Sequence, residues 1–99
     1  MSTGSDTMRR HLVRTFMPDG VLLRLPSKFE KRAVLLEVVA ERFEPGRRYP
    51  EREVDAVLAE LTGAGGSDHV TVRRYLVDHG LLGREHGEYW RTGGWVSGT

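Results

Sequence analysis

Arginine side chains carry most of the chemistry that this chain of 99 residues could perform. A guanidinium donates two parallel hydrogen bonds, a geometry that fits a phosphate group or the edge of a guanine. The candidate nucleic-acid-binding residues are His69, Thr71, Arg73, Arg74, Arg84 and Arg91, with Asp78 and His86 as weaker candidates. The alternative is structural, because Arg73 or Arg74 could pair with a carboxylate on a neighbouring helix and hold the helices together.

A second group of basic side chains lies earlier in the chain. Its members are Arg24, Lys28, Lys31, Arg32, Arg47 and Arg48. Lys28, Lys31 and Arg32 share one helix face by their spacing. This basic patch could meet DNA or the acidic surface of a partner protein, with Arg9, Arg10 and Arg14 nearby, or it could simply be solvated.

The first group lies in the C-terminal half of the chain and the second in the N-terminal half, and the two halves have net charges of opposite sign. The formal net charge is only +1, but residues 1–50 hold ten Lys and Arg against six Asp and Glu, a net +4. Residues 51–99 hold five arginines against eight acids, a net −3. A domain that binds DNA by itself usually has a concentrated basic face, because phosphate contacts supply most of the non-specific affinity. The charge distribution therefore favours weak or assisted DNA binding.

Other chemistry has little support in the sequence. The absence of cysteine excludes disulfides, thiol nucleophiles and cysteine zinc sites, and fits a reducing cytoplasm. The four histidines are not spaced three or four residues apart, so we expect no metal and no cofactor. The glycine-rich stretch at 63–67 lacks the lysine of a nucleotide-binding loop and is interpreted as a helix connection. We expect a non-enzyme, cytoplasmic and without a membrane span.

Three helices should position the basic side chains. Ser27 and Glu30 have the spacing of a capping box, which predicts a helix over 27–43. Its inner face would hold Phe29, Ala33, Leu36, Ala40 and Phe43. A second helix is predicted over about 50–61, with Val54, Val57, Leu58 and Leu61 inside. A third would begin at a cap on Ser67 or Asp68, end at Gly80, and turn Val72, Tyr75 and Leu76 inward.

A hairpin follows the third predicted helix. Its strands would cover 81–85 and 88–91 around the two-residue turn His86-Gly87, which places Gly83 opposite Trp90. A third strand could come from 21–25, after a turn at 18–20, or from Arg48-Tyr49. This order of elements predicts an α+β fold of the winged helix-turn-helix type, with three helices and a small antiparallel wing sheet. The domain would span 11–92, between a flexible arm over 1–10 and a flexible tail over 93–99 that contains Trp95.

Several runs of residues also resemble one bacterial family. They are Phe43-Glu44-Pro45-Gly46-Arg47-Arg48-Tyr49, Glu51-x-Glu53-Val54, the run from Val72 to Leu82, and Tyr89-Trp90-Arg91. In this order they resemble the domain of unknown function twenty-eighty-seven over about residues 16–92. Members of that family stand alone or follow ArsR-type helix-turn-helix regulators. The resemblance implies a winged-helix-like fold and an association with transcriptional control, and it supplies no catalytic residue, ligand or DNA site.

These observations predict a small winged-helix protein associated with transcriptional regulation, with weak or partner-assisted DNA binding. In a winged helix the third helix enters the major groove and the hairpin meets the DNA backbone. The alternative is an interaction module that docks on a regulator without touching DNA. A ligand sensor around Trp90 and Tyr75 is a third hypothesis. The expected partners are DNA, a regulatory protein or a second copy of the chain, and no membrane.

Overall fold

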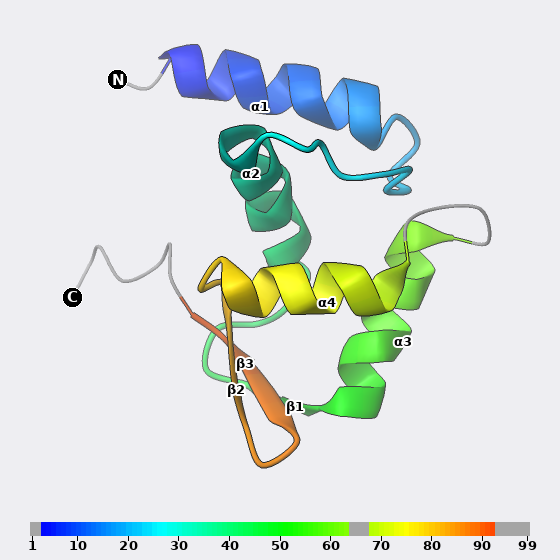
Figure 1. The fold of residues 1–99 in the computed structure, drawn as a ribbon, viewed down its shortest axis with the longest axis vertical. Helices are drawn as coiled ribbons and strands as arrows, with labels where there is room; N and C mark the ends of the chain where they lie inside the picture. The colour runs from blue at the N-terminus through cyan, green and yellow to red at the C-terminus, as the bar shows by residue number, and fades with distance from the viewer. Residues whose placement is uncertain (1–2, 64–67, 93–99) are drawn as a thin grey trace.

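Four helices and one small sheet make up the part of the chain that the computed structural model describes, residues 3–63 and 68–92. In chain order they are α1 (Thr3–Phe16), α2 (Phe29–Ala40), β1 (Arg48–Pro50), α3 (Glu51–Thr62), α4 (His69–Asp78), β2 (Leu82–Glu85) and β3 (Glu88–Arg91). Helix α1 lies at one end of the molecule and the sheet at the other (Figure 1). The predicted α+β class is confirmed.

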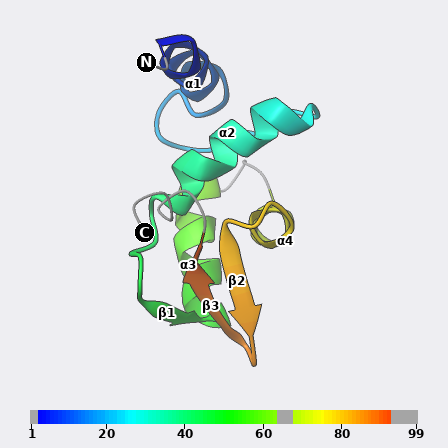
Figure 2. The ribbon, with the colours of Figure 1, turned by 90° about the vertical axis from the view of Figure 1, so that its left-hand side faces the viewer.

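The sheet is antiparallel and has the strand order β1-β3-β2. Strand β1 supplies the third strand at Arg48–Pro50, one of the two positions that the sequence predicted. Side chains alternate across a strand, so the register places Tyr49, Leu82 and Tyr89 on one face of the sheet, and all three are buried. Figure 2 shows the sheet beside α3 and α4. The sheet thereby closes one side of a core that the buried residues of α2, α3 and α4 complete.

The other candidate strand, 21–25, does not join the sheet. Its backbone is extended but is held by single hydrogen bonds to two different helices. The amide of Leu22 donates to the carbonyl of Leu61 at 2.9 Å, and the amide of Leu23 donates to that of Phe16 at 2.9 Å. Leu22 is fully buried, so this segment acts as an apolar strap between α1 and α3. The apolar run at 21–25 therefore reflects burial of Leu22 rather than strand pairing.

The expectation of a loose arm over residues 1–10 is wrong for most of that range. Helix α1 begins at Thr3 and continues to Phe16. It packs against α2 because Leu12 is buried and Val13 and Phe16 are partly buried at helical spacing. The predicted limits of the domain and the tail over 93–99 stay predictions, since that tail lies outside the described residues.

Helix α2 is shorter than predicted and starts differently. It covers Phe29–Ala40, and its N-cap is Lys28, whose side chain makes no capping hydrogen bond. The capping box of Ser27 and Glu30 is therefore not formed. Phe29, expected inside, is 63% exposed, while Leu35 and Val39 are buried beside Leu36 and Ala40. The face of α2 that packs into the core therefore includes Leu35 and Val39 and leaves out Phe29, so it is rotated about the helix axis from the predicted face.

Helix α4 and the hairpin agree with the sequence. The carboxylate of Asp68 accepts a hydrogen bond from the amide of Val70 at 3.1 Å, and Gly80, at φ +74°, follows the end of the helix. Val72 and Leu76 are its buried residues. The hairpin turns through His86 and Gly87, at φ +53° and +78°, as a type I′ turn requires. Helix α3 buries Val54, Leu58 and Leu61, three of the four residues predicted.

No helix in the described ranges is both long and apolar enough to span a bilayer.

Candidate nucleic-acid interface

Arg73 is engaged inside the domain rather than offered to a ligand. Its guanidinium donates to Asp55 on α3 and lies 3.8 Å from a carboxylate oxygen of Glu51, and its side chain is 18% exposed. The other carboxylate oxygen of Glu51 accepts a 2.9 Å hydrogen bond from the hydroxyl of Tyr89 on β3. These contacts tie α4, α3 and the sheet together. They favour the structural alternative for Arg73.

The titration of these groups reflects the same network. Burial alone would lower the pKa of Arg73, but the hydrogen bond and the charge of Asp55 raise it. Burial, followed by the hydrogen bond to Glu51, raises the pKa of Tyr89. Arg73 therefore stays charged and Tyr89 stays a hydrogen-bond donor at neutral pH.

The partners of Arg73 were not singled out from the sequence. Glu51 and Asp55 are four residues apart, which places them on one face of α3, but their position in its first turns also suits the helix dipole. The spacing of four residues between two carboxylates, followed by a helix that carries arginines, was the sequence feature that could have indicated these partners. The packing of α3 on α4 decides whether the two acids pair with Arg73 or only favour the helix dipole.

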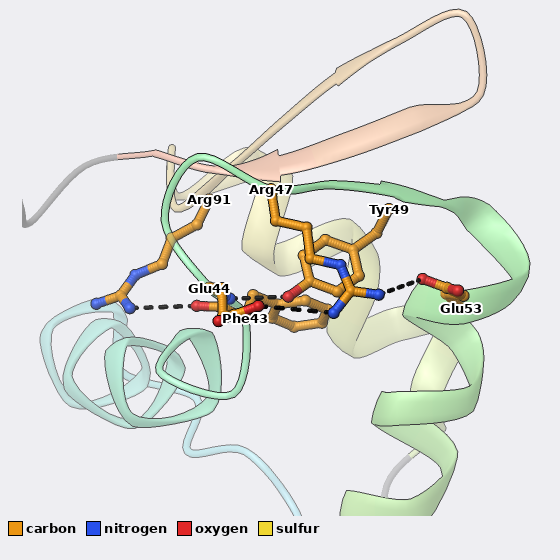
Figure 3. A network of polar contacts seen from close by, with 6 residues as sticks. All are labelled: Phe43, Glu44, Arg47, Tyr49, Glu53 and Arg91. Atoms are coloured by element: carbon orange, nitrogen blue, oxygen red, sulfur yellow. Dashed lines mark hydrogen bonds and ion pairs between the residues drawn. The ribbon is translucent and has the colours of Figure 1, made fainter.

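The side chain of Arg91 is also engaged within the domain. Its guanidinium donates to the main-chain carbonyl of Phe43, beyond the end of α2, at 3.3 Å (Figure 3). It thus braces β3 against the loop that leads from α2 to β1. Arg91 lies apart from the outward face of α4 on which the other candidates stand.

Arg74 and Arg84 are the two arginines of the predicted set that remain exposed. Both line one hollow of about 170 Å³ between α4 and the hairpin, together with Val70, Val77 and Asp78. Its base includes Arg73 and Tyr89. No described carboxylate forms an ion pair with Arg74 or Arg84.

The remaining candidates of this set lie at the two ends of α4 and at the hairpin tip. The hydroxyl of Thr71 donates to the Asp68 carboxylate at 3.3 Å, so the cap partly occupies it. His69 is half-buried and Asp78 is exposed. His86 is exposed at the turn, 3.9 Å from a carboxylate oxygen of Glu85.

The basic patch predicted from the first half of the chain is not one surface. Arg47 lies within 3.6 Å of Glu44 and 3.4 Å of Glu53, and its guanidinium covers the ring of Tyr49 at 4.6 Å (Figure 3). The hydroxyl of Tyr49 in turn accepts a 2.8 Å hydrogen bond from the amide of Glu44. This network fixes the loop after α2 and uses Arg47 to do so.

Arg48 and Arg32 are engaged at two further places. Arg48 lies 3.5 Å from Glu88 and 4.4 Å from the centre of the Trp90 ring, across the outer face of the sheet. Arg32 donates to Nε2 of His79 at 3.2 Å and covers the ring of Tyr75 at 4.4 Å. Trp90 and Tyr75 therefore have different neighbours, and these contacts do not unite them in one ligand site.

Arg24, Lys28 and Lys31 are the three members of the patch that stay together. They line a hollow of about 360 Å³ between α1 and the start of α2. No described carboxylate forms an ion pair with any of them. The patch is thus reduced to the end of the molecule at which α1 crosses α2.

His79 gives the contact between α2 and α4 a pH dependence. Burial, followed by the positive charge of Arg32, lowers the pKa of His79 from its ordinary value of 6.5, and Asp78 opposes this shift. The neutral imidazole accepts from Arg32, so its contribution to stability is present above about pH 6.5 and is lost as the pH falls through the lowered pKa. We expect the free energy of unfolding to fall on acidification through this window, as measured by denaturant titration.

The variant His79→Gln tests that expectation. It cannot gain the proton, so its free energy of unfolding should change less over the same pH window. Parallel pH curves for the two proteins would contradict a role of His79. The other three histidines are common to both proteins and cancel in the comparison.

The described residues include no group of three or more His, Asp or Glu that could hold a metal ion. The stretch interpreted as a helix connection begins at Gly63, which ends α3 at φ +67°, and its residues 64–67 lie outside the described ranges.

Comparison with known proteins identifies a family but no characterised relative. The model of a family described as "uncharacterized protein conserved in bacteria (DUF2087)" matches residues 21–91. No curated protein and no solved structure gives a significant match. The matched stretch begins after α1 and runs from the apolar strap to the end of β3, so it includes the Arg73 network and the hollow with Arg74 and Arg84. Because the match covers well over half of the chain, this protein belongs to the uncharacterised bacterial family DUF2087.

Proposed function

We propose that this chain is a winged-helix module associated with transcriptional regulation that contacts DNA weakly or with the help of a partner. The element order α2-β1-α3-α4-β2-β3, in which three helices precede a hairpin paired with β1, supports this proposal. In that arrangement α4 is the helix that faces the major groove. The hairpin beside it is the wing.

The exposed pair Arg74 and Arg84 carries this proposal. The two side chains come from the helix and from the hairpin, and they line the same hollow. Each can donate to a phosphate or to a guanine. Arg73 then has a positioning role, because it fixes the orientation of α4 through Asp55 and Glu51.

The same surface explains why the affinity should be low. Asp78 stands beside Arg74 in the hollow, and Glu85 follows Arg84 in β2. Val70 and Val77 occupy other positions on the outward face of α4. Two arginines among acids and valines give few phosphate contacts, and the number of those contacts sets the non-specific affinity.

A salt titration of binding to a random-sequence duplex tests the proposal. Each phosphate contact contributes about 0.9 to the slope of log affinity against log salt concentration, so Arg74→Ala and Arg84→Ala should each lower the slope by about that amount if they contact phosphates. Fluorescence anisotropy of a labelled duplex supplies the affinities. Arg52→Ala is the matched control, because Arg52 is exposed on α3 and also loses one charge. No duplex binding at low salt, or an equal change for all three variants, would contradict DNA contact by α4 and the hairpin.

A protein-docking module is the second candidate, and the exposure of Phe29 favours it. This side chain is 63% exposed and stacks on His79 at 4.4 Å, close to the end of α4. Val70 on α4 is 39% exposed. Absence of duplex binding, together with capture of one partner protein that Phe29→Ser abolishes, would favour this function over DNA contact.

A further inference from the structure

The end of the molecule at which α1 crosses α2 carries three exposed cations that line one hollow, and we call this surface the α1–α2 basic end. Its members are Arg24, Lys28 and Lys31. The structure gives none of them a carboxylate partner among the described residues. By contrast, Arg9, Arg47, Arg48 and Arg73 all lie within ion-pair distance of an acid.

The hollow in this end presents cations and hydroxyl groups without a carboxylate. His11 and Thr15 line it from α1, and Arg24, Ser27, Lys28 and Lys31 line it from the opposite side. The cationic and hydroxyl side chains can all donate hydrogen bonds, and three of them carry a fixed positive charge. A phosphate group, with several acceptor oxygens and a negative charge, complements this lining.

The α1–α2 basic end lies beside the proposed DNA-facing helix. In Figure 2 the start of α2 and α4 project toward the same side of the molecule, and Figure 1 shows the start of α2 close below α1. The stacking of Phe29 on His79 joins the start of α2 to the C-terminal end of α4. Lys28, the neighbour of Phe29 in the chain, therefore lies near that end of α4.

The tip of the hairpin has the opposite charge. Glu85 and Glu88 flank the turn at His86-Gly87, and both are exposed. Such a tip repels phosphates, so it is poorly suited to the backbone contact that a wing commonly makes. Beyond the contacts of Arg74 and Arg84, a duplex lying over α4 would find further positive charge toward the start of α2.

We propose that the α1–α2 basic end binds backbone phosphates of the same duplex that α4 faces, and that it takes over the backbone contact from the hairpin tip. This inference rests on the proposed function, since it needs a duplex at α4. Arg24, Lys28 and Lys31 all lie within the family match over 21–91, whereas Arg10 and Arg14 of α1 lie outside it and line a separate hollow with Val38. The contact is independent of base sequence, because only phosphates are touched.

The test uses the full chain, a random-sequence duplex and two double variants. Lys28→Ala/Lys31→Ala removes two charges from the basic end, and Arg42→Ala/Arg52→Ala removes two exposed charges from the end of α2 and from α3. Loss of two phosphate contacts should lower the slope of log affinity against log salt concentration by about 1.8, from 0.9 for each contact. The control should keep the slope of the unchanged protein. Equal melting temperatures for all three proteins verify that the fold is intact.

The outcomes separate this inference from the proposed function. A slope lowered by the Lys28/Lys31 variant and by Arg74→Ala supports both. A slope lowered only by Arg74→Ala overturns the basic end as a contact and leaves the proposed function standing. A slope lowered only by the Lys28/Lys31 variant overturns DNA contact by α4 and, with it, the inference that one duplex meets both sites, although phosphate binding at the basic end would stand. No binding by the unchanged protein at low salt overturns both.

Discussion

Leu76→Ala is expected to lower the free energy of unfolding by about 2–5 kcal/mol, the range for removing a fully buried leucine. Leu76 has no exposed surface and lies at the centre of the inner face of α4. Its main-chain carbonyl accepts a 2.9 Å hydrogen bond from the amide of Leu81, which starts the chain toward β2. The cavity left by the side chain would lie in the core that α4 shares with α2, α3 and the sheet. Denaturant titration with linear extrapolation measures the loss.

Val70→Ala is the matched control for this experiment. Val70 is on the same helix but 39% exposed, so its truncation should change the free energy of unfolding by less than about 0.5 kcal/mol. Equal losses for the two variants would contradict the assignment of the inner face of α4. That assignment matters for function, because it decides which face of α4 is left to meet a ligand.

The parts of the fold that the sequence predicts well are those governed by local chemistry. Asp68 caps α4 through a hydrogen bond to an amide two residues away, and Gly80 and Gly87 occupy positions at positive φ that favour glycine. His86-Gly87 can only be a tight turn between strands of this length. In each case the residue type and its immediate neighbours determine the conformation. No distant part of the chain is needed.

One error is local, because Ser27 and Glu30 have capping-box spacing but Arg32, five residues after Ser27, donates to the Ser27 carbonyl at 3.0 Å and the helix begins after Lys28. The other errors arise where a distant part of the chain competes with local preference. Phe29 is apolar and at the right period, yet it stacks on His79 from outside. Leu22 is buried by α1 and α3 rather than by a strand. Local spacing cannot show which helix will cover a given apolar side chain.

The candidate site was predictable as a list of residues but not as a surface. Arg73 and Arg74 are adjacent in the chain and equal in chemistry, and helical geometry turns one toward Asp55 and the other outward. Arg47 and Arg48 were grouped with Lys28 by charge, but the loop after α2 carries them to the sheet. Whether a cation forms an ion pair depends on the positions of the acids of α3 and β3 in space. Only the tertiary structure shows those positions.

Gly83→Ala is expected to destabilise the protein by about 1–3 kcal/mol, as overpacking of a tightly filled site does. A Cβ atom at Gly83 would stand 2.5 Å from Nε1 and 2.6 Å from Cζ2 of Trp90, and it would also meet Cε2 of the same ring. Displacement of the indole would break its contact with the guanidinium of Arg48, which lies 4.4 Å from the ring centre. The backbone of Gly83 is not at positive φ, so alanine itself fits that conformation. Without a clash, replacement of a strand glycine by alanine stabilises the folded state by about 0.5–1 kcal/mol.

A double-mutant cycle with Trp90→Ala separates the clash from any effect on the backbone. If the clash dominates, Gly83→Ala should become neutral or stabilising once the indole is gone, which gives a coupling energy of at least about 1 kcal/mol. The same loss in both backgrounds would mean that the strand tolerates no side chain at residue 83 for a backbone reason. In a Trp95→Phe background Trp90 is the only tryptophan, and its emission should shift to longer wavelength in Gly83→Ala as the ring is displaced toward water. Trp90 on β3 also contacts Arg48 on β1, which is the edge strand on the far side of β3 from β2. Displacement of the ring would weaken the pairing of β1 with β3. The destabilisation should therefore extend across all three strands.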